Sequence, residues 1–141
     1  MINSFVPDYM HAVILGVVKL LFQLWFSSKN HDKPFYIGLK LNQFTERLLR
    51  CKPPKEVTRT PQPLDEHYKA SEWKNLLIYY SVPCLKGLLP TKYLNHWYLF
   101  TYSMTIFLKD IITDEEFISA ENALDKFVKD FESLYGLSNM R

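Results

Sequence analysis

The sequence predicts an all-α fold, an irregular bundle of about five helices. The chain of 141 residues is long enough to bury a proper core. Nearly half of its residues are apolar, with nine Tyr, ten Phe and three Trp, whereas Gly occurs only four times. This composition favours packed helices. No short segment alternates cleanly between apolar and polar side chains, as a half-buried strand would.

Two helices are predicted in residues 1–50. The first runs from about Asp8 to Phe26, because small or polar residues recur there at helical spacing, opposite an apolar face. These residues are Ala12, Gly16, Lys19, Gln23 and Ser27. A second, shorter helix is predicted from Ile37 to Arg50. Its apolar stripe consists of Leu41, Phe44, Leu48 and Leu49.

Residues 51–68 are predicted to form a Pro-rich basic loop. Each proline disfavours helix at its own position and at the residue before it. The prolines are Pro53, Pro54, Pro61 and Pro63. A loop of this length inside a compact domain usually has a function. We expect the loop to connect the two parts of a single domain, residues 1–141.

Residues 69–141 are predicted to form the helical half of that domain. One helix begins around Lys69 and stops before Pro83, and the segment from Cys84 to Pro90 forms a short helical turn. The next helix runs from Lys92 to Lys109. Apolar residues surround most of its circumference, so we expect it to be the largely buried, central helix.

The last helix has the most distinct boundaries. Thr113 and Glu116 have the spacing of a capping box at its start, and Gly136 ends it. Its predicted apolar stripe consists of Phe117, Ala120, Leu124, Phe127, Val128, Phe131 and Leu134.

The apolar run from Ala12 to Phe26 is not predicted to be a membrane span. It has fifteen residues and is interrupted by Lys19 and Gln23, whereas a span needs about 20 mostly apolar positions. No basic segment precedes the run and no small-residue cleavage site follows it, so a signal peptide is not predicted either. We therefore expect no membrane partner.

Cysteine and histidine positions give no metal-binding pattern. Cys51 and Cys84 lie far apart in the sequence and form no Cys-x-x-Cys pair. This spacing predicts a reduced, intracellular protein without a zinc site. His31, His67 and His96 are scattered, and each is expected on the surface or on a helix face.

Charge is distributed unevenly along the chain. The formal net charge is only +2, but the segment from Lys19 to Arg59 holds nine Lys or Arg and three acids. The segment from Lys109 to Glu132 holds eight acids and three Lys. The basic half can face phosphate groups, but such charges are also ordinary on a solvated surface. Lys52, Lys55 and Arg59 in the loop are the candidate DNA-binding residues.

Asp8 and His11 form an Asp-x-x-His motif at the start of the first helix. Two side chains three positions apart share a helix face and can meet a common ligand. Alternatively, Asp8 caps the helix and His11 packs or forms a hydrogen bond to Asp8.

Five phrases in the chain, in their order, resemble the transposase-derived proteins of the CACTA (EnSpm-like) DNA transposons. The resemblance covers nearly the whole chain. The phrases are Phe5-Val6-Pro7-Asp8-Tyr9-Met10-His11, Leu15-Gly16-Val17-Val18-Lys19, Lys69-Ala70-Ser71-Glu72-Trp73, Leu85-Lys86-Gly87-Leu88-Leu89-Pro90, and Phe127-Val128 with Phe131-Glu132 and Leu134-Tyr135-Gly136.

This resemblance implies an RNase H-like core in which an Asp, Asp, Glu triad binds divalent metal, Mg²⁺ in an intact relative. Asp8 and His11 would be the family's Asp-x-x-His signature, which lies between the second Asp and the Glu. Glu72 would be the candidate catalytic Glu that closes the triad. The alternative for Glu72 is an acid in the first turn of a helix, paired with Lys69 or Lys74.

The chain departs from the family pattern before Asp8. The catalytic core would place two further aspartates on upstream strands, but seven residues precede Asp8 and no sheet-forming segment replaces the missing part. Tyr68 stands where relatives carry Trp. We therefore expect a fragment of a DDE-type transposase, the helical insertion with its flanks, which contacts DNA weakly and lacks strand-transfer activity. It would be nuclear if expressed and otherwise intracellular.

The second functional hypothesis is a domesticated helical module that binds another protein through exposed apolar surface. Trp25, Trp73 and Trp97 are expected in the core instead of forming a base-stacking platform.

Overall fold

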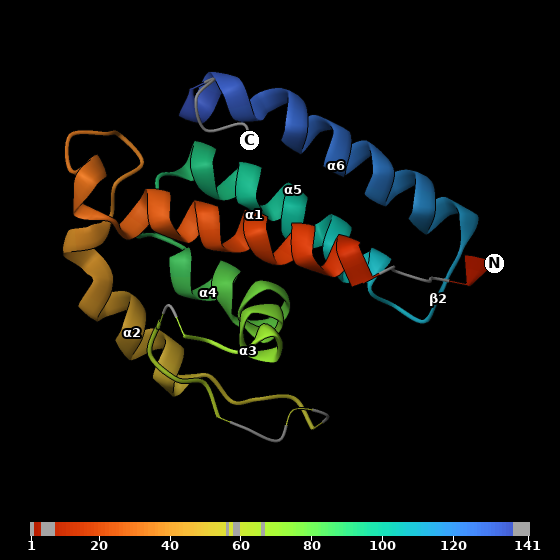
Figure 1. The fold of residues 1–141 in the computed structure, drawn as a ribbon, viewed down its shortest axis with the longest axis horizontal. Helices are drawn as coiled ribbons and strands as arrows, with labels where there is room; N and C mark the ends of the chain where they lie inside the picture. Colours follow the sequence, from red (N-terminus) through yellow and green to blue (C-terminus); the bar gives the residue numbers. More distant parts are fainter. Residues whose placement is uncertain (1, 4–7, 56, 58–59, 66, 137–141) are drawn as a thin grey trace. The chain divides into compact units, whose positions relative to one another are not determined.

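The computed structural model describes residues 2–3, 8–55, 57, 60–65 and 67–136, and it confirms the all-α class (Figure 1). The chain divides into two compact units. The first contains Met1–Asp8 and Thr91–Arg141, and the second contains Tyr9–Pro90. The number of cooperative domains stays a prediction. No helix in the described residues is long and apolar enough to cross a membrane.

In the second unit, helix α1 covers Asp8–Phe26, as predicted. Helix α2 covers Leu41–Arg50 and thus begins later than predicted. The reason lies at Ile37, whose N–H donates to the Trp25 carbonyl at 2.7 Å. Ile37 is buried there, and the short 3₁₀ turn η2, Gly38–Lys40, precedes α2.

Aromatic packing joins the helices of this unit. The ring of Phe44 from α2 lies 5.9 Å from that of Phe22 and 5.2 Å from that of Phe26, both in α1. The ring centroids of Phe22 and Trp73 are 6.1 Å apart. The predicted core positions of Trp25, Trp73 and Trp97 are confirmed, since each is at most 6% exposed. By contrast, the predicted stripe of α2 is only half buried, because Leu41 and Leu49 are exposed.

The helical segment after the loop continues through Pro83, so the predicted end before this proline is wrong. Helix α3, Ala70–Asn75, is followed by the π-helical turn η3, Leu76–Tyr80, and by α4, Ser81–Leu85. The wider π turn shifts the register of backbone hydrogen bonds ahead of Pro83, which lacks an N–H. The Ser81 hydroxyl donates to the Leu77 carbonyl at 3.1 Å. The chain then turns at Gly87, whose φ of 82° suits glycine.

In the first unit, α5, Thr91–Phe107, and α6, Asp114–Tyr135, lie side by side (Figure 1). The capping box is confirmed, because Glu116 N–H donates to Thr113 Oγ1 at 3.0 Å and Thr113 N–H donates to Glu116 Oε1 at 2.9 Å. Most of the predicted stripe of α6 faces inward, but Val128 is 51% exposed. Helix α5 is largely buried, as predicted.

Helix α5 ends two residues earlier than predicted. The chain leaves it for β2, Ile111–Ile112, which pairs antiparallel with β1, Ile2–Asn3. Lys109 forms an ion pair with Glu116 beside this connection. These two-residue strands are too short for the sequence to show alternation.

We predict that Phe44→Ala lowers the free energy of unfolding by about 3–5 kcal/mol, because it removes a fully buried ring from the aromatic cluster. Leu49→Ala in the same helix is the matched control, since Leu49 is 51% exposed. Its effect should stay within about 1 kcal/mol. Urea unfolding measures both changes, and equal losses would contradict the assigned packing of α2.

Candidate functional site

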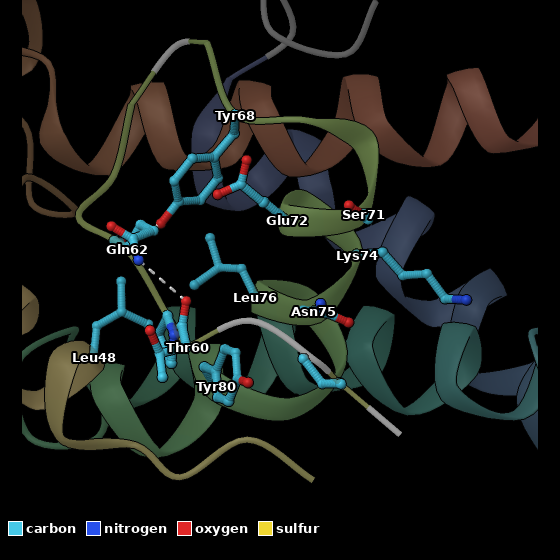
Figure 2. Close-up of a pocket in the computed structure, with 12 residues that line it drawn as sticks. Leu48, Thr60, Gln62, Tyr68, Ser71, Glu72, Lys74, Asn75, Leu76 and Tyr80 are labelled. Atoms are coloured by element: carbon cyan, nitrogen blue, oxygen red, sulfur yellow. Dashed lines mark hydrogen bonds between the residues drawn. The ribbon is translucent and has the colours of Figure 1, made fainter. Parts of the chain in front are cut away.

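A pocket of about 270 Å³ lies between the 51–68 loop and the α3–η3 segment (Figure 2). Glu72, the candidate catalytic residue, is in its lining, together with Lys74 and several uncharged polar residues. The uncharged polar residues of the lining are Thr60, Gln62, Tyr68, Ser71, Asn75 and Tyr80. The pocket can therefore offer hydrogen bonds of both polarities to a small polar group.

Glu72 is held in place by its own helix. It is the third residue of α3, and its Oε1 accepts a hydrogen bond from the Lys69 N–H at 3.0 Å. An acid at this position also interacts favourably with the helix dipole. Among the described residues, no ion pair joins Glu72 to Lys69 or Lys74. Of the alternative predicted for Glu72, the structure therefore shows the acid in the first turn of a helix, as a cap, but not the pairing with a lysine.

Tyr68 forms the wall of the pocket beside Glu72 (Figure 2). Its hydroxyl donates to the Gln62 carbonyl, and its ring lies edge-on to Trp73 with centroids 5.0 Å apart. Burial raises the pKa of Tyr68, and the negative charges of Glu72 and Asp65 raise it further. Tyr68 is therefore a neutral hydrogen-bonding group at physiological pH. It also fixes one end of the loop against α3.

Tyr80 is a pocket residue that sequence reasoning missed. Its side chain is 5% exposed, and its buried hydroxyl has no hydrogen-bond partner among the described residues. A buried hydroxyl without a partner is energetically costly. The sequence analysis did not single out Tyr80, because the π turn in which it lies has no recognisable sequence pattern.

The described residues around Glu72 do not fit the divalent metal that the family resemblance implies. Metal-assisted cleavage of DNA uses several convergent carboxylates, whereas Glu72 is the single carboxylate in the described lining and Lys74 adds a positive charge. No group of three or more His, Cys, Asp or Glu able to hold a metal occurs in the described part of the chain.

The Asp-x-x-His motif lies at the start of α1. His11 is exposed there. Asp8 is the first residue of α1, but its side chain lies outside the described residues. Whether the two side chains meet therefore stays a prediction. No hydrogen bond or ion pair connects His11 to Glu72 within the described residues.

Of the candidate DNA-binding residues, Lys52 and Lys55 are exposed on the loop, and Arg59 lies outside the described residues. Neither lysine forms an ion pair within the described part of the chain. As far as the described residues go, both ammonium groups are without an ion-pair partner and can meet an anion. They are not part of the Glu72 pocket.

Arg47 is a second residue whose role the sequence did not reveal. Its Nη1 donates to the carbonyls of Cys84 at 3.2 Å and Lys86 at 2.5 Å, and Lys40 Nζ donates to the Leu88 carbonyl at 3.4 Å. These carbonyls lie at and just after the end of α4, where helical hydrogen bonding stops. Cations of α2 and η2 thus bind the negative end of α4.

A second concavity lies in the first unit, between α5 and α6. Its lining contains Lys92, Lys126 and Asp130 beside His96. His96 is 3% exposed, its Nε2 donates to the Phe127 carbonyl at 2.7 Å, and its ring stacks on Phe127 at 4.2 Å. Burial lowers the pKa of His96. These contacts identify His96 as a neutral residue of the helix interface.

Comparison with known proteins adds no family assignment: no family model, no curated protein and no solved structure matches the chain.

We predict that Glu72→Gln lowers the pKa of Tyr68 but leaves it above the ordinary value of about 10, because burial is the larger cause of its elevation. NMR of ring-labelled tyrosine follows the titration, and Tyr68→Phe identifies the signal. Glu46→Gln is the control, since Glu46 is an exposed acid paired with Arg50. An unchanged pKa in Glu72→Gln would contradict the proximity of the two side chains.

The same shift has a consequence for stability. The pKa of Tyr68 is higher in the folded chain than in the unfolded chain. The contribution of this shift to the free energy of unfolding is therefore complete below about pH 10. It is lost as the pH rises from there toward the folded value. Urea unfolding should therefore show a steeper loss of stability above about pH 10 in the wild type than in Tyr68→Phe.

Proposed function

We propose that this chain is part of a transposase-derived protein of the CACTA type and that it contacts DNA through the basic 51–68 loop. The observation that carries the proposal is the order of the five family-like phrases along nearly the whole sequence. In this proposal the helices are the insertion and flanks of an RNase H-like transposase. Asp8 and His11 are its signature residues, and Glu72 is the Glu that closes the triad in an intact relative.

Two features of the loop support DNA contact. Lys52 and Lys55 are exposed and unpaired within the described residues, on either side of Pro53 and Pro54. Two consecutive prolines restrict the backbone to extended conformations, which separates the cations along the chain. Exposed cations at such spacing can follow a phosphate backbone, and each neutralised phosphate releases counterions.

The position of Glu72 supports its assignment within this proposal. It lies in the first turn of a helix directly after the long loop, and its carboxylate borders a polar pocket. We do not propose that this chain cleaves DNA by itself, because one carboxylate cannot position the metal ions that phosphoryl transfer of this kind requires. Nicking of supercoiled plasmid by the chain with Mg²⁺ or Mn²⁺, lost in Glu72→Gln, would overturn that part.

A second candidate function, a helical module that binds another protein, rests on exposed apolar side chains. Leu39 is 91% exposed, and Leu41 and Leu49 are 38% and 51% exposed in or beside α2. Single exposed apolar residues are normal. These residues lie close together in the sequence, so this function has a specific test. The double variant Leu39→Ser, Leu49→Ser should lose partner binding.

For the leading proposal, we predict salt-dependent DNA binding that depends on Lys52, Lys55 and Arg59. Replacing all three with Gln should reduce the slope of log K against log salt by about 2–3, since each phosphate contact contributes about 0.9. Fluorescence anisotropy with a duplex oligonucleotide at several salt concentrations measures this slope.

The control replaces Lys33, Lys126 and Lys129, which are exposed lysines outside the loop, with Gln. Net charge then changes equally in the two variants. A general charge effect would reduce the slope similarly in both, and that result would contradict a DNA contact at the loop. Binding that does not respond to salt would favour the protein-binding alternative.

A further inference from the structure

The two cysteines, far apart in the sequence, are neighbours in the fold. Cys51 is the residue that caps the end of α2, and Cys84 lies in α4. Their sulfur atoms are 3.7 Å apart. Cys84 is 1% exposed, whereas Cys51 is half-buried. One thiol is therefore accessible from solvent, and the second lies directly behind it.

The contacts around the sulfur atoms keep them close. Cys51 Sγ donates to the Arg47 carbonyl at 3.4 Å, and Arg47 Nη1 donates to the Cys84 carbonyl at 3.2 Å. The side chain of Arg47 thus binds the backbone of Cys84, and its backbone carbonyl accepts a hydrogen bond from the Cys51 thiol. A disulfide requires a sulfur separation of about 2.05 Å. Bond formation needs the two sulfurs to approach by less than about 2 Å, which a side-chain rotation of Cys51 at the end of α2 can provide.

We propose that Cys51 and Cys84 form a reversible modification site, a thiol pair that closes to an intrachain disulfide when it meets a low-molecular-weight disulfide such as oxidised glutathione. The reaction proceeds by thiol–disulfide exchange. This inference does not depend on DNA binding or on the proposed family. It rests on the position and burial of the two sulfur atoms.

The exchange has two balanced steps. The Cys51 thiolate attacks one sulfur of oxidised glutathione, which forms a mixed disulfide and releases one glutathione thiolate. The Cys84 sulfur then attacks Cys51 Sγ, breaks the bond to the second glutathione and gives its proton to the released thiolate. The two cysteines lose two electrons in total, and one oxidised glutathione becomes two reduced molecules.

The order of these steps follows from the environments of the two thiols. Burial raises the pKa of Cys84 to about 12, and its hydrogen bond with Cys51 also raises it. Cys84 therefore stays protonated until a disulfide is formed next to it. The neighbouring positive charge of Arg47 acts in the opposite direction and favours the Cys84 thiolate during the second step.

The disulfide would fix the beginning of the 51–68 loop to α4. Leu48 and Tyr80, which line the Glu72 pocket, lie one turn before Cys51 and one turn before Cys84 respectively. Burial raises the pKa of Tyr80, and the negative charge of a Cys51 thiolate raises it further. Closure of the pair therefore stiffens the wall of the pocket as well as the start of the loop.

The test uses the full chain, incubated with mixtures of reduced and oxidised glutathione and then alkylated. Intact-mass spectrometry should show loss of both thiols in a monomer without a glutathione adduct, and peptide mapping should identify the Cys51–Cys84 bond. The melting temperature should rise by about 10 °C on oxidation, because the new bond closes a loop of some thirty residues. A dithiol reductant should reverse the change.

Two variants separate the roles of the cysteines. Cys84→Ala should accumulate a stable glutathione adduct at Cys51, because the second step is lost. Cys51→Ser should stay unmodified, because Cys84 is buried. A persistent glutathione adduct on wild-type Cys51, disulfide-linked dimers, or two unreacted thiols would each overturn the proposal, and these results need only the wild-type chain.

Discussion

The structure of the second unit depends on satisfying the carbonyl groups where α4 ends. Helical hydrogen bonding stops there, which leaves the last carbonyl groups without a partner inside the helix. Arg47 supplies charged donors to two of these carbonyls, and Lys40 supplies a third. Because both cations come from α2 and the turn before it, their hydrogen bonds fix α2 against α4. Phe44 and Leu48, on the same helix, are then buried.

This constraint also determines where the loop begins. Helix α2 ends at Arg50, one turn after Arg47, so Cys51 is held beside Cys84. The prolines that follow end the helical conformation. The loop returns at Tyr68, whose ring packs on Trp73 and whose hydroxyl binds the Gln62 carbonyl. These contacts anchor both ends of the loop beside the polar pocket. The exposed Lys52 and Lys55 have no ion-pair partner among the described residues.

The sequence predicted those features that depend on local chemistry. The capping box at Thr113 and Glu116 and the apolar periodicity of α1 and α6 are short-range signals, and the structure confirms them. The sequence analysis missed features that depend on tertiary contacts. Ile37 looks helical but donates its N–H to Trp25, and Pro83 looks like a helix end but follows a π turn. The proximity of Cys51 and Cys84, and the unpaired Tyr80 hydroxyl, require the fold itself.

Glu72 illustrates why its residue type and position alone cannot assign its role. As a cap, its Oε1 accepts the Lys69 N–H and stabilises the first turn of α3. The same hydrogen bond orients the carboxylate at the pocket, beside Tyr68. There, burial raises the pKa of the phenol, and the charge of Glu72 raises it further. A carboxylate fixed in this way is prepared to accept further hydrogen bonds or to join other acids at a metal. Its structural role therefore provides the orientation that a catalytic role would require, and only additional carboxylates would distinguish the second role from the first.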